Sequence, residues 1–338
     1  MDIILIITIL IVICALAFDF INGFHDTANS IATSVSTRAL PPRKAVMLAA
    51  VMNFLGAISF VGVAKAIASD IVDPFSLYIG PDDTTGSVVI LAALISAITW
   101  NLLTWYFGIP SSSSHTLIGS IAGAAIAAAG FNILNYEGFL NILKALIFSP
   151  FLAFGVGFLM MSLFKILFKN LNLYKTNKGF RTFQIFTASL QAFTHGTNDA
   201  QKAMGIITMA LIAAGIQSDD EVQTWVRVAC ALAMGLGTSI GGYKIIKTVG
   251  TKIMKIRPVN GAAADLASAT VIFGATLIHL PVSTTHVISS SIMGVGSAQR
   301  VKGVKWGVAR KIVLTWIITM PISAVIAALI YFILDMFF

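Results

Sequence analysis

The sequence predicts an all-α polytopic membrane protein with an inverted-topology repeat, broken helices, two helical hairpins and about 10–12 transmembrane elements. Three observations predict this fold: the apolar composition, the separation of basic from acidic loops, and a pair of motifs that occurs twice. Of 338 residues, 57% are hydrophobic and only 11% are charged, against about 25% charged in an average soluble protein. So few charges cannot solvate a chain of this size, which excludes a cytosolic enzyme, a disordered chain and a disulfide scaffold.

Basic residues gather in loops that contain no acids. Of the 22 Lys and Arg residues, 18 lie in four clusters, at 38–44, 165–181, 244–257 and 300–311, and ten of the 14 acids lie in other polar stretches. By the positive-inside rule the basic loops are cytoplasmic, which places the N-terminus and the C-terminus outside a plasma (inner) membrane. Topology then explains the net charge, so the lipid bilayer is an expected partner and nucleic acid is not.

Eight apolar stretches give the order of the elements. They run at about 3–33, 45–68, 86–130, 145–168, 182–216, 222–242, 260–298 and 310–334. A helix crosses the bilayer in about 20 residues, so the longer stretches 3–33 and 182–216 are predicted to be broken or tilted around a polar interruption. The stretches 86–130 and 260–298 begin and end on one side of the membrane, so each is predicted to be a hairpin.

Two polar motifs occur once in each half of the chain. Residues 23–30 have a counterpart at 196–203, with the two aspartates 173 residues apart, and the Pro-x-Ser-Ser/Thr-Ser/Thr-His turn at 110–115 has one at 281–286, with the histidines 171 apart. The charge pattern gives the two halves opposite orientations, which defines an inverted repeat. The predicted divisions are 1–131 as the first repeat, 132–180 as the linking span and basic loop, 181–298 as the second repeat, and 299–338 as a basic loop and final span. Residues 171–181 are the predicted linker.

Four aspartates lie within apolar stretches, where a carboxylate is costly and marks a functional candidate. Asp26 and Asp199 occupy matching positions in the two halves, which favours a site. Asp19 is either part of that site or a helix-pairing residue, and Asp265 is either an ion ligand or an interfacial residue. The flanking side chains are Thr27, Asn29, Thr197 and Asn198. Their oxygens are hard ligands suited to a sodium ion, and the same residue types also cap broken helices.

Each Pro-x-Ser-Ser/Thr-Ser/Thr-His turn ends one half-helix and begins the next with hydroxyls and free backbone N–H groups. Helix N-termini favour anions, so two such turns that meet near the midplane would form an anion pocket. Serine and threonine also cap and pack transmembrane helices, but repetition in register with the aspartate motif favours the pocket. The five histidines lack the spacing of a zinc site, and no cofactor is predicted other than a coupling ion.

These motifs resemble those of the inorganic phosphate transporter (PiT) family, and the resemblance covers nearly the whole chain. The family signature is Gly-x-Asn-Asp-x-x-Asn in each half, followed later by the Pro-x-Ser-Ser/Thr-Ser/Thr-His turn. His25 stands at the first Asn of the signature, Lys202 at the last, and Asn53 where the family often has Glu. Asp265 matches an acid that often precedes the second turn. The resemblance, which is to the bacterial branch, implies secondary-active symport of inorganic phosphate driven by sodium or protons.

We therefore expect a sodium-driven symporter that imports inorganic phosphate, and not an enzyme. The expected phosphate ligands are Thr27, Ser112, Ser113, Ser114, Ser283, Thr284 and Thr285. The expected coupling-ion ligands are Asp26, Asn29, Asn198, Asp199 and Asp265, with sodium at Asp26, Asn29 and Asp199. Lys202 is either a fixed positive charge or a residue that neutralises Asp199, and His25 is a second charge partner.

Several alternatives stay open at this point. Within the transporter class they are proton-coupled symport of phosphate or of a neutral metal–phosphate, and transport of sulfate or another oxyanion. A passive anion channel is disfavoured because paired intramembrane acids oppose anion flow. A membrane-embedded phosphatase is disfavoured because no nucleophile and base stand at a suitable spacing. The sequence is compatible with a homodimer but does not determine the oligomeric state.

Overall fold

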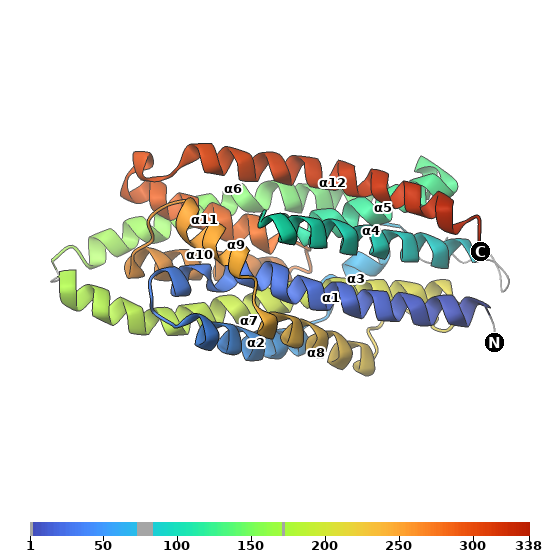
Figure 1. Ribbon diagram of the computed structural model, residues 1–338, viewed down its shortest axis with the longest axis horizontal. Coiled ribbons are helices and arrows are strands. Elements are labelled where there is room, and N and C mark those ends of the chain that lie inside the picture. Colours follow the sequence, from blue (N-terminus) through green and yellow to red (C-terminus); the bar gives the residue numbers. More distant parts are fainter. Residues whose placement is uncertain (1–2, 73–83, 171–172) are drawn as a thin grey trace.

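The computed structural model describes residues 3–72, 84–170 and 173–338, without the side chains of Thr27, 173–176 and 243–244. These residues form the twelve α-helices of Figure 1. The helices are α1 (Ile3–Ser36), α2 (Pro42–Ser59), α3 (Gly62–Ser69), α4 (Thr85–Phe107), α5 (Ser113–Ala129), α6 (Tyr136–Leu167), α7 (Leu173–Ala213), α8 (Thr224–Ile240), α9 (Tyr243–Lys247), α10 (Pro258–Leu277), α11 (Thr284–Gln299) and α12 (Trp306–Leu334). Short turns of other helix types are η2 (Phe131–Ile133), η3 (Thr248–Lys252) and η4 (Val301–Gly303).

The molecule is a multi-pass membrane protein. Within the described ranges, α1, α4, α6 and α12 are each long and apolar enough to cross a bilayer. The pair α2–α3 and the pair formed by α8 with residues 245–252 also qualify, although they are bent by 68° and 69°. Large apolar side chains cover the outer surface, among them Phe151 on α6, which is 72% exposed, as expected of a lipid-facing helix.

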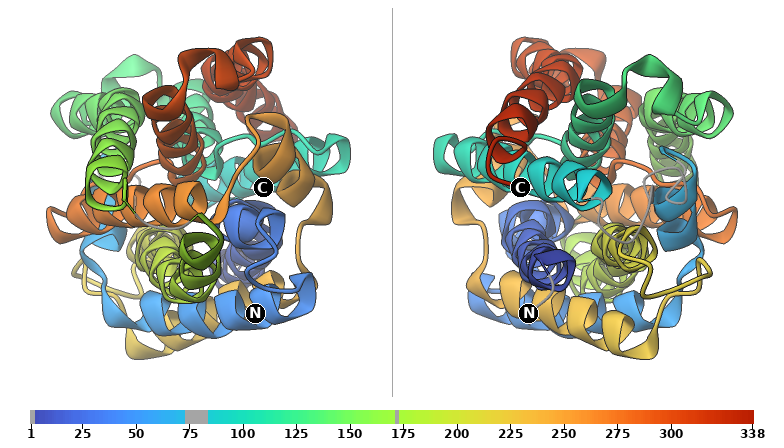
Figure 2. Two further views of the ribbon diagram at one scale, coloured as in Figure 1. Left: turned by 90° about the vertical axis from the view of Figure 1, so that its left-hand side faces the viewer. Right: turned by 90° about the vertical axis from the view of Figure 1, so that its right-hand side faces the viewer.

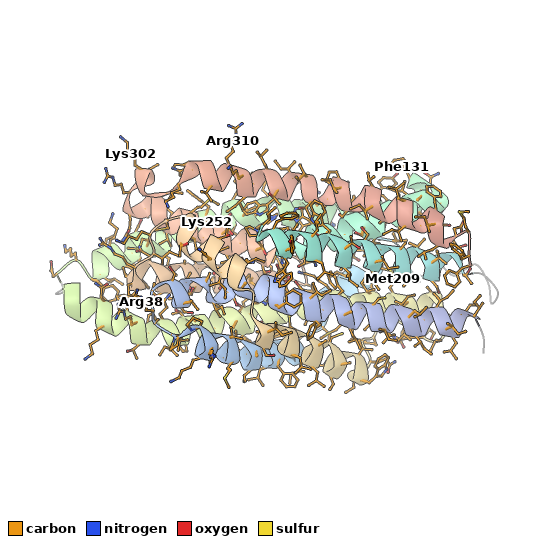
Figure 3. All side chains as sticks on the ribbon, viewed as in Figure 1. Arg38, Phe131, Met209, Lys252, Lys302 and Arg310 are labelled. Atoms are coloured by element: carbon orange, nitrogen blue, oxygen red, sulfur yellow. The ribbon has the colours of Figure 1, made fainter. Side chains whose placement is uncertain are left out.

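The basic loops gather at one end of the bundle. Both chain termini lie at one end of the long axis, and Arg38, Lys252 and Lys302 lie toward the other (Figures 1 and 3). We refer to these as the terminal end and the basic end. The separation of charge in the sequence is therefore a separation in space.

The two long helices α1 and α7 lie in the centre and run in opposite directions. α1 packs against α4, α7 and α8, and α7 packs against α2, α3 and α10. Viewed end-on, α1 and α7 lie between a layer formed by α2 and α8 and a group that contains α5, α6 and α12 (Figure 2). A central position removes their polar residues from both water and lipid, so those residues must find partners within the bundle.

Both predicted hairpins are confirmed. α4 and α5 are joined by a turn at residues 108–112, and α10 and α11 by a turn at 278–283. Gly108, with φ at 64°, lies in the left-handed region and ends α4. α5 then packs on α12, whereas α11 packs on α6.

Broken helices are present, but not at the predicted positions. α1 continues through residues 23–30 and α7 through 196–203 without interruption. The glycines in these motifs serve close packing, because a Cβ on Gly23 would lie 2.5 Å from the carbonyl oxygen of Met234 and one on Gly196 would lie 2.3 Å from that of Asn53. The side chains of Asp26 and Asp199 are hydrogen-bonded to residues of α5 and α11. They do not need a break in α1 or α7 to find partners. The breaks occur between α2 and α3 and at Gly241–Gly242.

The predicted linker at 171–181 is also different in the structure, because α7 begins at Leu173 and residues 173–181 are helical. The inverted relation of the two halves stays a prediction, as do the divisions at 131, 180 and 298. The structure supplies matched parts for it: each half contains a long central helix, a bent pair and a hairpin.

A pair of glycines on α6 allows a test of the packing. A Cβ on Gly157 would lie 2.5 Å from the carbonyl oxygen of Ser291 on α11, whereas one on Gly155 would meet nothing within 4 Å. We expect Gly157→Ala to lower the melting temperature of the detergent-purified protein, because overpacking costs about 1–3 kcal/mol. Gly155→Ala is the matched control. Equal melting temperatures for the two variants would contradict the described α6–α11 interface.

Candidate functional site

The tips of the two hairpins meet in the interior of the bundle. Ser112 caps α5 by accepting a hydrogen bond from His115 N (3.1 Å), and Ser283 caps α11 in the same way from His286 N (3.2 Å). The tips touch where Ser114 Oγ donates to the carbonyl oxygen of Val282 (2.8 Å). From there α5 runs toward the terminal end and α11 toward the basic end (Figure 1). Two helix N-termini therefore converge from opposite sides.

Asp26 on α1 is held by both tips. Ser113 Oγ donates to Asp26 Oδ2 (2.6 Å), and Thr285 Oγ1 donates to Asp26 Oδ1 (3.2 Å). His25 Nδ1 lies 2.6 Å from Asp26 Oδ1. The aspartate is 1% exposed, so one carboxylate links α1 to the first turn of α5 and the first turn of α11.

Asp199 on α7 has an equivalent arrangement. Thr284 Oγ1 donates to Asp199 Oδ2 (2.9 Å), and Lys202 Nζ donates to Asp199 Oδ1 (2.7 Å). Lys202 Nζ also donates to Ser113 Oγ (2.9 Å). Lys202 is 1% exposed, and an ammonium at this depth is tolerated only when it is paired. The lysine therefore both neutralises Asp199 and brings a fixed positive charge to the hairpin tips.

The residues three positions after each aspartate have matching roles. Asn29 Nδ2 donates to Thr285 Oγ1 (2.9 Å), as Lys202 donates to Ser113. Each therefore reaches a hydroxyl in the first turn of a hairpin helix. The side-chain oxygen of Asn29 has no hydrogen-bond partner among the described residues. One half of the site thus presents a fixed cation where the other presents a free oxygen.

The structure does not bring every predicted site residue to the tips. Asn198 turns toward the second hairpin, where Nδ2 donates to Thr276 Oγ1 (3.3 Å) and Oδ1 accepts from Val282 N (3.4 Å). It positions the tip of that hairpin and does not join Asp26. Ser112 and Ser283 act as caps, and Ser114 bonds the opposite tip. The side chain of Thr27 lies outside the described part of the chain.

Asp265 forms a separate polar locus nearer the basic end. Its oxygens accept from Thr33 Oγ1 on α1 (2.6 Å) and from Thr187 Oγ1 on α7 (3.0 Å). Thr33 follows Asp26 by seven residues, which is about 10 Å along a helix. Asp265 is thus joined to the same two central helices as the tips, but at another level.

Sequence reasoning named His25 as a charge partner, but it did not place Thr104, Ser111 or the His195–Asn53 pair around the aspartates. His195 Nε2 lies 3.2 Å from Asp199 Oδ2, and His195 Nδ1 lies 3.0 Å from Asn53 Oδ1. His25 Nε2 contacts Thr104 Oγ1 (3.1 Å) and Ser111 Oγ (3.4 Å). The heptad spacing from Asp26 to Thr33 was a usable signal, whereas nothing in the sequence pairs α4 with α1.

The donor set favours a hard cation over a transition metal. Within the described residues, no group of three His, Cys, Asp or Glu side chains could hold a metal ion. The site instead offers carboxylate, amide and hydroxyl oxygens, which suit sodium. It also offers two helix N-termini and an ammonium, which suit an anion. Groups that suit a cation and groups that suit an anion are hydrogen-bonded to one another here, through Ser113.

Comparison with known proteins agrees with this geometry. A sequence model described as the phosphate transporter family matches residues 22–327. The chain is 69% identical to a probable low-affinity inorganic phosphate transporter of Bacillus subtilis, covering 100% of both chains, and 45% identical to a protein of the same description in Rhizobium meliloti, covering 95% of each. A solved structure titled the sodium-dependent phosphate transporter superposes with a TM-score of 0.88 at 26% identity, covering 98% of this chain and 100% of that one. The chain belongs to the phosphate transporter family.

Proposed function

We propose that this chain imports inorganic phosphate across the plasma membrane by symport with sodium, with its basic loops in the cytoplasm. The observation that carries the proposal is the junction at Ser113. There one hydroxyl accepts from the ammonium of Lys202 and donates to the carboxylate of Asp26, at the meeting point of two helix N-termini. An oxyanion and a cation can both be satisfied in such a place. The relatives are described as phosphate transporters and the solved structure as a sodium-dependent one, which supports the proposal.

Phosphate would bind between the hairpin tips. The hydroxyls of Ser113, Thr284 and Thr285 now donate to carboxylates, and each can turn toward an anion held by the N–H groups of α5 and α11. A carboxylate freed in this way can accept a hydrogen bond from the protonated oxygen of hydrogen phosphate. Sulfate has no proton to donate and would be repelled, which favours phosphate as the substrate.

Sodium would bind on the side of Asp26. The free side-chain oxygen of Asn29 and the carboxylate of Asp26 are hard ligands one helical turn apart. On the other half of the site, Lys202 already supplies the positive charge. Asp265, with the hydroxyls of Thr33 and Thr187, is a second candidate cation site toward the basic end. Alternation of access would follow from movement of the central site elements against the outer helices.

The direct test is uptake of labelled phosphate into proteoliposomes that contain the purified protein, with sodium and pH gradients imposed separately. We expect an inward sodium gradient to drive accumulation, and we expect arsenate to compete better than sulfate. Accumulation driven by the pH gradient alone would replace sodium with protons as the coupling ion. Uptake that ignores both gradients would refute coupled transport.

Removal of either aspartate charge should abolish uptake. In Asp26→Asn and Asp199→Asn the size of the side chain is kept, but the carboxylate that receives the tip hydroxyls is lost, so we expect a fall of at least about 100-fold in initial rate. Asp335→Asn is the matched control, because Asp335 lies at the end of α12 and bonds only Tyr331 among the described contacts. Normal uptake by both site variants would exclude the mechanism.

The role of Lys202 can be separated from its packing. Lys202→Asn reproduces the residue that the first half has at Asn29, so an additional sodium ion should replace the lost ammonium. We expect uptake by Lys202→Asn to depend more steeply on sodium concentration than wild-type uptake, whereas Lys202→Met, which offers no oxygen, should be inactive. A sodium dependence of Lys202→Asn identical to wild type would show that the lysine is not a substitute cation.

A further inference from the structure

A buried polar stripe runs along α1 and extends past the hairpin tips toward the terminal end. Its members, spaced alternately three and four residues apart, are Asp19, Asn22, Asp26, Asn29 and Thr33. This spacing keeps them on one face of the helix, and each is no more than 1% exposed. The proposed function uses Asp26, Asn29 and Thr33. Asp19 and Asn22 have no role in it.

The unused end of the stripe lacks hydrogen-bond partners. Both carboxylate oxygens of Asp19 and both side-chain polar atoms of Asn22 are unpaired among the described residues. The same is true of both side-chain polar atoms of Asn101 on α4, which is 0% exposed. Buried polar atoms nearly always have a hydrogen-bond partner. A buried carboxylate without one has an especially large free-energy cost. Three such side chains in one region point to a ligand that binds them.

The register of α1 and α4 places Asn101 beside Asn22. Both helices run from the terminal end toward the basic end (Figure 1). They are locked together by His25 Nε2 against Thr104 Oγ1 at 3.1 Å. Asn22 and Asn101 each lie three residues before those contact residues, on the same face of their helices. This register puts Asn22 and Asn101 at the same level, one turn nearer the terminal end, and Asp19 a further turn along α1.

The charges around Asp19 leave it without a counterion. The charged groups within electrostatic range of it are Asp199 and Lys202, and the remaining titratable neighbour is the thiol of Cys230 on α8. Lys202 is already bonded to Asp199 and Ser113. Asp26 has His25 beside it and Asp199 has His195 and Lys202, whereas Asp19 has no hydrogen-bonded partner among the described residues. A bound cation would supply the partner that this buried carboxylate lacks.

We propose that Asp19, Asn22 and Asn101 form a binding site for a sodium ion, about 10 Å along α1 from Asp26 toward the terminal end. The ligands are hard oxygens, four of them from side chains, and water can complete the shell. The site lies at the edge of the matched family region, which begins at Asn22 and leaves Asp19 outside. Binding here is independent of phosphate transport. A role for this site in binding sodium before the ion moves on to Asp26 rests on the proposed function.

The test is equilibrium binding of radioactive sodium to the full-length protein in detergent, in choline buffer without phosphate. We expect Asp19→Asn to bind one sodium ion fewer per chain than wild type, or to bind it at least about tenfold more weakly. Asp70→Asn, which removes a carboxylate at the end of α3, is the matched control and should bind like wild type. Equal sodium number and affinity in wild type and Asp19→Asn would overturn the site.

A second variant keeps the test informative if Asp19→Asn does not fold. Asn101→Ala removes a neutral ligand and should weaken the same sodium ion, at least about fivefold, while the protein stays monodisperse on size exclusion. Unchanged binding in a monodisperse Asn101→Ala protein would also overturn the site. Phosphate uptake is measured in parallel: sodium binding that depends on Asp19 without sodium-driven uptake would refute the proposed symport and leave the site standing.

Discussion

The hydroxyl of Ser113 joins the two halves of this protein, and most of the interior is arranged around it. It accepts from Lys202 on α7 and donates to Asp26 on α1. A buried ammonium and a buried carboxylate are each costly in an apolar medium. The first turn of α5 must therefore lie between the two central helices to keep both groups bonded. On their other sides the central helices pack closely at the same level, α1 on α8 at Gly23 and α7 on α2 at Gly196.

The surroundings of this junction are different toward the two ends of the molecule. Toward the basic end, buried polar side chains continue along α7 through Gln191 and Thr187, and Thr187 joins Thr33 of α1 at Asp265. Toward the terminal end, α7 presents the apolar residues that follow Lys202. An ion that leaves the tips toward the basic end keeps polar partners, whereas α7 offers almost none in the other direction. On α7, buried polar partners therefore lie mainly toward the basic end, whereas toward the terminal end they lie on α1, at Asp19 and Asn22.

The sequence predicted the helical membrane fold, the two hairpins and the meeting of Asp26 and Asp199 with the hydroxyl turns, because duplicated polar motifs in apolar segments have few alternatives. It left the long stretches 3–33 and 182–216 as either broken or tilted, and both are continuous helices in the structure. A motif such as Gly-x-x-Asp is compatible with a broken helix or with a continuous one, and only the presence of Ser113 and Thr285 across the bundle decides between them. The contact of Asn198 with Thr276 on α10, 78 residues away, could not be predicted from local sequence either. The pairing of α4 with α1 has no signal in a single sequence.

Departures from symmetry explain how a nearly duplicated site can carry an anion and a cation together. At matching positions the first half has Asn29 and the second has Lys202, and both reach a hydroxyl of a hairpin tip. A permanent ammonium cannot leave with the substrate, whereas an ion held by Asp26 and the free oxygen of Asn29 can. In the proposed symport, the half with Lys202 would therefore keep its counter-charge through the cycle, and the half with Asn29 would acquire and release one. The proposed coupling would then depend mainly on α1, the helix whose polar stripe extends beyond the tips in both directions.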